Sequence, residues 1–69
     1  KLALVDKLIC VKDLVNENGA VFTKEGDIWE NTYYGTVNTS RLIRMRENGI
    51  PEWLTIHHDL LMEHFEEYK

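Results

Sequence analysis

The histidines in the last third of the chain come nearest to a metal-binding pattern. His57 and His64 are seven residues apart, His58 adds a third imidazole, and the carboxylates Asp59 and Glu63 lie between them. Zinc sites on helices favour ligands at positions i and i+4, so a separation of two turns does not easily bring both rings to one ion. We therefore expect these histidines to cover the core with their ring edges in solvent, and we predict no metal site.

Cys10 is the only thiol, and nucleophilic catalysis would need it exposed beside a base. Its neighbours Ile9 and Val11 favour a buried, inert thiol instead. The chain has no glycine-rich phosphate loop and no pair of acids at catalytic spacing, and it is too short to enclose a pocket of ordinary size. We therefore predict that the protein is not an enzyme and uses no cofactor.

A short basic strip with aromatic neighbours has the residue types that bind single-stranded nucleic acid. The strip consists of Arg41, Arg44 and Arg46, and the aromatic residues are Trp29, Tyr33 and Tyr34. Small β-domains stack bases on aromatic rings beside a basic groove. In a strand, however, Arg41 alternates with Arg44 and Arg46, so the three side chains cannot share one face. The alternative is a solvated strand edge whose charges discourage aggregation.

The aromatic residues are also of the types that anchor protein interfaces. A chain of this size has few core positions, because a domain of about 60 residues buries only about 60% of the surface of its unfolded chain. We expect either Trp29 or Trp53 to be partly exposed, the alternative being that both lie in the core. Exposed Trp and Tyr beside Arg form interface hot spots. The candidate anchors for a protein partner are therefore Trp29, Tyr33, Tyr34 and Trp53.

Charge is distributed unevenly along the chain. Residues 1–46 contain seven bases and six acids, a net +1, whereas residues 47–69 contain one base and six acids, a net −5. The total of −4 argues against general affinity for DNA, RNA or an anionic membrane, because phosphate binding needs clustered Lys and Arg. Asp59, Glu63 and Glu66 form the acidic face of the expected helix, which would dock a basic partner or simply keep the protein soluble.

Length and composition indicate a single domain across residues 1–69, since no repeat, linker or low-complexity stretch divides the chain. A single cysteine excludes a disulfide framework, and a free thiol without a signal peptide indicates a reducing, cytoplasmic setting. No apolar run approaches the roughly 20 residues that a membrane span needs, so we expect no membrane association.

Hydrophobic patterning predicts five short strands followed by a helix. The strands are expected at 8–11, 20–23, 28–34, 41–46 and 53–56. Turns are expected at 16–19, 24–27 and 47–49, with Gly26 in the left-handed conformation. From about 56 to 67 the period becomes that of an amphipathic helix, with Thr55 as the N-cap and a C-terminal end that frays.

Several short motifs resemble those of SH3-type barrels. Ala3-Leu4-Val5-Asp6 is similar to the opening Ala-Leu-Tyr-Asp motif, and residues 22–28 are similar to the turn that starts the second sheet. Asn48-Gly49 and then Trp53-Leu54 lie where the distal hairpin and the final strand occur in that family. The paired tryptophans, the opening tyrosines and the Pro-Ser-Asn-Tyr of the polyproline groove are missing, so PxxP recognition is not implied. The ending of the chain also resembles small proteins of Gram-positive bacteria and their phages.

Together, the residues and this resemblance predict a mainly β fold, a small five-stranded SH3-like barrel with a short C-terminal helix. The expected function is that of a non-catalytic protein-interaction or regulatory module that acts by stoichiometric binding, as a phage or prophage protein. The alternative is single-stranded nucleic-acid binding through the strand at 41–46 and the nearby aromatic residues. Self-association is a third hypothesis, because a small barrel with exposed edges can bury a tryptophan against its own copy.

Overall fold

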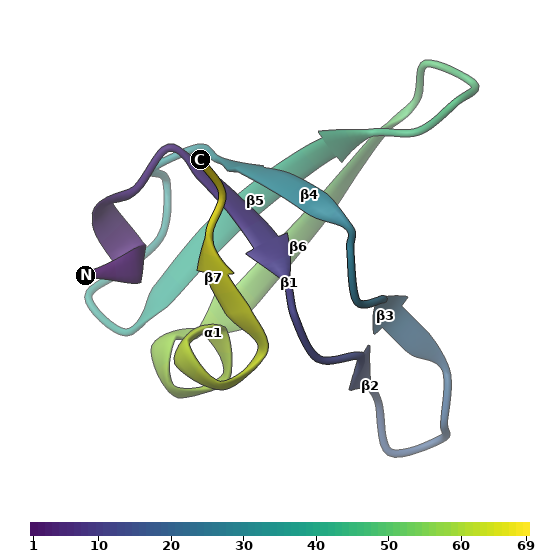
Figure 1. The fold of residues 1–69 in the computed structure, drawn as a ribbon, viewed down its shortest axis with the longest axis horizontal. Coiled ribbons are helices and arrows are strands. Elements are labelled where there is room, and N and C mark those ends of the chain that lie inside the picture. Colours follow the sequence, from purple (N-terminus) through teal and green to yellow (C-terminus); the bar gives the residue numbers. More distant parts are fainter.

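The computed structural model describes residues 1–69 and shows a mainly β fold with one short α-helix, as the sequence predicts. In chain order the elements are η1 (Leu2–Leu4), β1 (Lys7–Cys10), β2 (Leu14–Val15), β3 (Val21–Thr23), β4 (Ile28–Asn31), β5 (Thr39–Met45), β6 (Pro51–His57), α1 (His58–His64) and β7 (Phe65–Glu67). Five antiparallel strands form the main sheet in the order β6-β5-β4-β1-β7, and β2 and β3 form a separate hairpin. In Figure 1 the β5–β6 hairpin projects at the upper right and the β2–β3 hairpin at the lower right.

The core lies on the inner face of the main sheet, where alternate residues of each strand are buried. Eight hydrophobic residues that are at most 7% exposed form it: Leu8, Cys10, Leu14, Trp29, Leu42, Ile56, Leu61 and Phe65. In β1 the pattern is strict, since Leu8 and Cys10 are buried while Lys7 is exposed and Ile9 only partly covered. This alternation is the period of two that a strand with one buried face requires. The strands predicted at 8–11 and 20–23 are confirmed as β1 and β3.

The predicted turns also occur. Gly26 has a φ of 97°, a left-handed conformation that a residue without a Cβ adopts at little cost, and its N–H donates to the Cys10 carbonyl at 2.7 Å. In the turn between β2 and β3, the Asn16 side chain accepts from the N–H groups of Asn18 and Ala20. In the turn between β5 and β6, the Asn48 side chain accepts from the Ile50 N–H, and Gly49 has a φ of 81°. Both Asn-Gly turns therefore lie where the sequence places them.

The strand predicted at 28–34 is shorter than expected, because β4 ends at Asn31. The Asn31 amide donates to the carbonyls of Ala3 and Val5, which ties the end of β4 to the N-terminal segment. Tyr33 then has a φ of 64°, which is incompatible with a continued strand. The aromatic density that predicted a strand here is thus overridden by a loop that turns back toward β5.

The C-terminal helix is also shorter than the predicted 56–67. Ile56 and His57 remain paired with β5, so the N-cap is His57 rather than Thr55. At the other end Phe65 is extended and lies opposite Cys10, so the last turn expected to fray is instead β7, paired with β1. The prediction of five strands is therefore corrected to seven, of which five form the main sheet.

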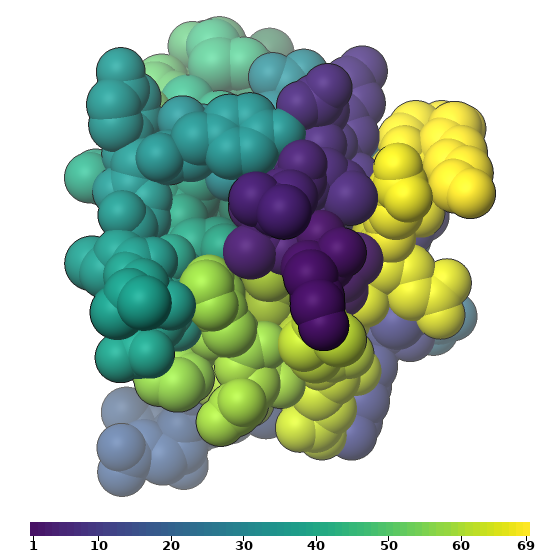
Figure 2. All heavy atoms as spheres, turned by 90° about the vertical axis from the view of Figure 1, so that its left-hand side faces the viewer, coloured from purple at the N-terminus to yellow at the C-terminus, as the bar shows by residue number.

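The N-terminal segment, which resembles the opening motif of SH3-type barrels, contains no strand. Leu2–Leu4 is a 3-10 helix that precedes β1. Figure 2 shows this purple segment between the teal β4–β5 loop and the yellow C-terminal residues, with α1 in lime green below it. Three parts of the chain that are distant in sequence thus meet on one face of the molecule.

We predict that Phe65→Ala lowers the free energy of unfolding by about 3–5 kcal/mol, because it opens a cavity in the core. Phe65 is 1% exposed, whereas Tyr68 is 42% exposed. If residues 65–68 were part of the predicted helix, the two side chains would lie on the same face. Urea unfolding followed by circular dichroism measures both, with Tyr68→Ala as the matched control. Equal losses from the two substitutions would show that β7 does not place Phe65 in the core.

Candidate functional site

The two tryptophans lie in opposite environments, which confirms the expectation that one is partly exposed. Trp29 on β4 is 1% exposed and Trp53 on β6 is 49% exposed. A partner cannot reach the Trp29 ring in this structure, so Trp29 is a core residue and leaves the set of candidate anchors. Trp53 remains in that set.

Trp29 begins a chain of polar contacts that crosses several strands. Its indole N–H donates to the Thr23 hydroxyl at 2.9 Å, and that hydroxyl donates to Oδ2 of Asp27 at 3.0 Å. Thr23 is 1% exposed, so this arrangement satisfies two buried polar groups at once. The same Asp27 oxygen accepts the backbone N–H of Lys24 at 2.8 Å, which fixes the turn between β3 and β4.

Arg44 on β5 continues this network from the other side. Its guanidinium lies over the Trp29 ring at 4.6 Å, with Nη1 2.6 Å from Asp27 and Nε 2.8 Å from Glu52 on β6. Arg46 donates to the same Glu52 oxygen at 2.7 Å. We call Thr23, Asp27, Trp29, Arg44, Arg46 and Glu52 the Arg44 network.

The charges of the Arg44 network shift the pKa values of its acids. Burial alone raises the pKa of Asp27, but hydrogen bonds from the Lys24 N–H, Arg44 and Thr23 outweigh it and hold that pKa below its ordinary 3.8. Burial likewise raises the pKa of Glu52, and the hydrogen bonds from Arg44 and Arg46 bring it below its ordinary 4.5. Both carboxyls are therefore ionised at neutral pH, and the pKa of Arg44 is raised by the same pairs against the opposing effect of burial.

The basic strip is divided between the two faces of β5, as the alternation predicts. Arg44 points inward and is held by two carboxylates, and Arg46 is paired with Glu52. Only Arg41 points outward without a carboxylate partner, and its guanidinium lies over the Trp53 ring at 4.8 Å. A track of free cations of the kind that binds a phosphate backbone is therefore not formed by these three side chains.

Arg41 and Trp53 belong to an outward surface that we call the outer hairpin face. It consists of the outward residues of β5 and β6: Thr39, Arg41, Ile43, Met45, Pro51, Trp53, Thr55 and His57. Ile43 lies directly opposite Trp53 in the strand register. None of the eight is Lys, Asp or Glu, although such residues are frequent in the chain as a whole. Met45 is 64% exposed, so this surface presents apolar side chains to solvent.

The two tyrosines occupy a different place, in the loop between β4 and β5. The Tyr33 hydroxyl donates to the Asp6 carboxylate, and this hydrogen bond raises the pKa of Tyr33. The Tyr33 hydroxyl oxygen also lies 3.3 Å from the Leu4 carbonyl oxygen. Ala3, Leu4 and Tyr33 help to line a small pocket of about 300 Å³. Tyr34 is 82% exposed. The structure thus sets Tyr33 beside the N-terminal segment and Trp53 on the outer face of β6.

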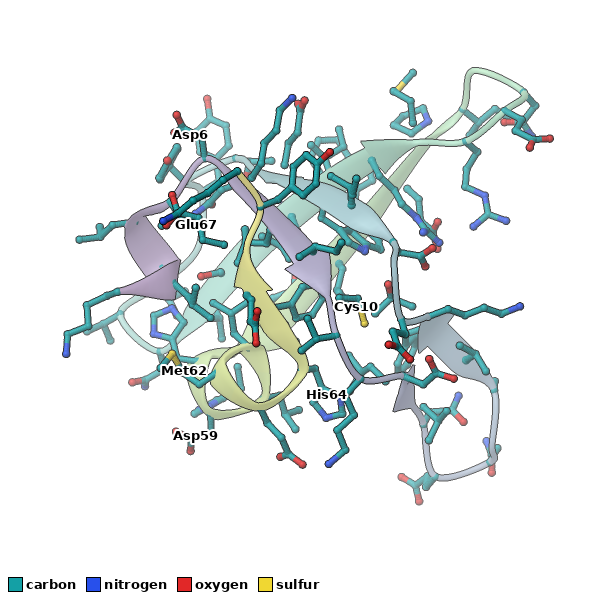
Figure 3. The ribbon with its side chains drawn as sticks, viewed as in Figure 1. Asp6, Cys10, Asp59, Met62, His64 and Glu67 are labelled. Carbon is teal, nitrogen blue, oxygen red and sulfur yellow. The ribbon has the colours of Figure 1, made fainter.

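The acidic face expected on one helix is split between two elements. Asp59 and Glu63 lie on α1, but Glu66 lies on β7, opposite Ile9 of β1. Glu63 is 2.7 Å from the Lys12 ammonium, and this hydrogen bond lowers the pKa of Glu63. Figure 3 shows Asp59 and Met62 at the solvent side of α1. With Glu63 already paired, these acids do not act as one free anionic surface.

Cys10 and His64 are both buried, and each contacts the same backbone atom rather than the other. The Cys10 thiol donates to the Lys12 carbonyl at 3.1 Å, and Nδ1 of His64 lies 2.9 Å from that oxygen. Burial raises the pKa of the Cys10 thiol, which makes the thiolate less available. Figure 3 shows the Cys10 side chain at β1 and the His64 side chain at the end of α1, and no hydrogen bond joins the thiol to the imidazole.

The other two histidines have different surroundings again. His57 is exposed on β6, with its Nδ1 3.9 Å from Asp59, and Nε2 of His58 lies 3.1 Å from the Ser40 hydroxyl. No group of three or more His, Cys, Asp or Glu side chains lies close enough to hold a metal ion.

The sequence did not indicate the open groove of about 700 Å³ between β3 and the β5–β6 hairpin. Phe22 and Met45 line it together with every member of the Arg44 network except Trp29. In this groove Asp27 is 17 positions from Arg44 and 25 positions from Glu52 along the chain, so no local sequence pattern indicates that these charged residues meet.

Comparisons of the chain with protein-family models, with curated proteins and with solved structures find no match. None of the helices in the structure has the length and apolar character needed to cross a membrane.

We predict that the protein loses stability in acid through the Arg44 network. The folded-state pKa values of Asp27 and Glu52 lie below their ordinary ones, so their contribution is complete above about pH 5 and is lost as the pH falls through the folded values. Asp27→Asn should lower the free energy of unfolding at pH 7 by about 1–3 kcal/mol and flatten its decline between pH 5 and 2, estimated from hydrogen bonds to charged groups.

Urea unfolding at a series of pH values measures this effect. The control is Glu17→Gln in the exposed β2–β3 turn, which should follow the unmodified protein. A pH profile of Asp27→Asn parallel to that of the unmodified protein would contradict the role assigned to Asp27.

Proposed function

We propose that this chain is a non-catalytic protein-interaction module that binds its partner stoichiometrically through the outer hairpin face. The observation that supports this proposal most strongly is the half-exposed Trp53 under the Arg41 guanidinium. The eight residues of this face include no Lys, Asp or Glu, and the exposed Glu30 of β4, which pairs with Ile43, borders it. The centres of protein interfaces are enriched in aromatic residues, Met and Arg and depleted of Lys, Glu and Asp. Trp53, Arg41 and Met45 supply these enriched types on one face.

The chemistry of the face indicates the kind of partner surface that fits it. Trp53, Ile43 and Met45 offer apolar area, so the matching surface is apolar at its centre. Arg41 has no carboxylate of its own, so a carboxylate of the partner placed beside it would form a charge-assisted pair. The proposed partner surface is therefore apolar, with an acidic residue at its margin.

We further propose that the scaffold is an SH3-like barrel. The strand order β6-β5-β4-β1-β7, in which the last strand pairs with the first, supports this description. The connection from β1 to β4 carries the β2–β3 hairpin, and residues 22–28, which resemble the turn that starts the second sheet of that family, join β3 to β4. The buried, unpaired thiol of Cys10 supports a cytoplasmic setting.

Rigidity of the platform supports binding without large rearrangement. β5 and β6 pair over seven registered positions, from Thr39 opposite His57 to Met45 opposite Pro51. Beneath them, Arg44 and Glu52 lock the two strands to the turn at Asp27. A surface held in this way loses little conformational entropy when it binds.

We predict that Trp53→Ala abolishes partner capture while the protein stays folded. Loss of cross-strand and cation–π contacts at this exposed position should cost only about 1 kcal/mol of stability. The immobilised protein and its variants are incubated with an extract of the source cells, and retained proteins are identified by mass spectrometry. The complex with each retained protein is then reconstituted and titrated by calorimetry, with a stoichiometry of one partner per chain expected.

Val37→Ala is the matched control, because Val37 is 88% exposed but lies in the β4–β5 loop. It should bind as the unmodified protein does. A Trp53→Ala variant that is folded and retains every partner at unchanged affinity would rule out the outer hairpin face as the binding surface.

A further inference from the structure

The direction of the backbone groups in β5 determines which groups of β6 are free. The Arg41 carbonyl accepts from the Thr32 N–H at 3.0 Å, so odd-numbered residues of β5 direct their backbone groups toward β4. The backbone N–H of Arg46 donates to the Ile50 carbonyl at 3.0 Å, so the backbone groups of even-numbered residues point toward β6. Alternation along an antiparallel ladder then pairs the even residues of β6 with β5 and turns its odd residues outward.

β6 is an edge strand whose outward backbone groups have no partner. The outward set comprises the N–H groups of Trp53, Thr55 and His57 and the C=O groups of Pro51, Trp53 and Thr55. No hydrogen bond from a loop or turn reaches them, and Trp53, Thr55 and His57 are all exposed. A row of this kind is a template for pairing with another strand. At the opposite edge, β7 is only three residues long.

We propose that two copies of this chain associate through β6, antiparallel and around a two-fold axis at Leu54. In this register the N–H of Trp53 donates to the Thr55 carbonyl of the second copy, and the N–H of Thr55 donates to the Trp53 carbonyl. The N–H of His57 donates to the Pro51 carbonyl of the second copy. The two main sheets become one continuous sheet.

In this register more of the free backbone groups of β6 form hydrogen bonds than in the adjacent registers. Because β6 can pair with itself in this way, we choose a second copy as the occupant. Pro51 has no N–H, and in this register it lies opposite His57 of the second copy. His57 is the N-cap of α1, so its carbonyl accepts a hydrogen bond within the helix and needs no other donor. Every free N–H and C=O of the edge therefore finds a partner. If the axis lies at Trp53 or at Thr55 instead, the ladder shifts and the N–H of His57 or the C=O of Pro51 loses its partner.

The side chains at this edge are also self-complementary. Leu54 shares the inner face with its neighbour Leu42 and would lie directly opposite Leu54 of the second copy, leucine against leucine. Glu52 is the only Asp, Glu, Lys or Arg of β6, and it would lie opposite Ile56, far from the second Glu52. On the outer face the two Trp53 rings become diagonal neighbours. No like charges are placed opposite each other within the paired strands.

The dimer goes beyond the proposed function and does not compete with it. Strands add at the edge of a sheet, so the outer hairpin face of each copy stays open to solvent. Two such faces would then lie side by side on one sheet. Because dimerisation is measured on the protein alone, its failure leaves the test of partner capture by Trp53→Ala untouched.

Sedimentation velocity from about 1 µM to about 1 mM, the range in which small interfaces dissociate, tests this proposal. We expect the apparent mass to rise with concentration from 8.2 kDa toward twice that value. Thr55→Pro removes an outward N–H without touching the β5 ladder, and proline is tolerated at such edge positions. It should weaken the dimer at least about tenfold, whereas Thr55→Ala, which keeps the N–H, should not.

Hydrogen exchange on the unmodified protein provides a second measurement that requires no variant. At high concentration the amides of Trp53, Thr55 and His57 should become protected, while their exchange in dilute solution is fast. The proposal is overturned if the mass stays at 8.2 kDa throughout, if folded Thr55→Pro associates as the unmodified protein does, or if concentration-dependent protection appears at another edge.

Discussion

The placement of Arg44 between two carboxylates and over an indole ring is the contact on which the rest of the structure depends. The guanidinium is largely withdrawn from water, with a side-chain exposure of 18%, and such a charge is tolerated only when it is paired and hydrogen-bonded. Asp27 and Glu52 provide the pairs, from the turn before β4 and from β6. One side chain therefore connects three segments, β5, β6 and the turn before β4, next to a core of eight hydrophobic residues.

The same strand that carries this inward cation presents an outward one. Because side chains alternate in β5, fixing Arg44 inward necessarily turns Arg41 outward, where it covers Trp53. The interior and the outer hairpin face thus share one register, and a slip by a single residue would exchange a buried ion pair for an exposed one. The two arginine–tryptophan stacks lie on opposite sides of one sheet, one holding the fold together and one available to a partner.

Local patterns predicted much of the fold, and contacts distant in sequence account for most of the differences. The alternation in Leu8–Cys10, the Asn-Gly turns and Gly26 depend on neighbouring residues, so they could be read from the chain. Phe65 has helical spacing from Leu61, yet pairing with β1, more than fifty residues earlier, makes it the first residue of a strand. The partial exposure of one tryptophan followed from the small size of the chain, and the splitting of the arginines followed from alternation, but which tryptophan is exposed was not predicted. The partners of Arg44 carry no local signal, because they are brought together only by the folded sheet.

The position of β1 in the sheet has a consequence for how the protein is made. β1 is synthesised early, yet its two neighbours are β4 and β7, so one side of it is unpaired until residues 65–67 have been added. Until β7 has paired, β1 is an open edge of the sheet. A nascent chain in this state is open to pairing with the wrong strand, and pairings this distant in sequence form slowly. Pairing of residues 65–67 thus completes the sheet, and without it β1 would be an unpaired edge strand.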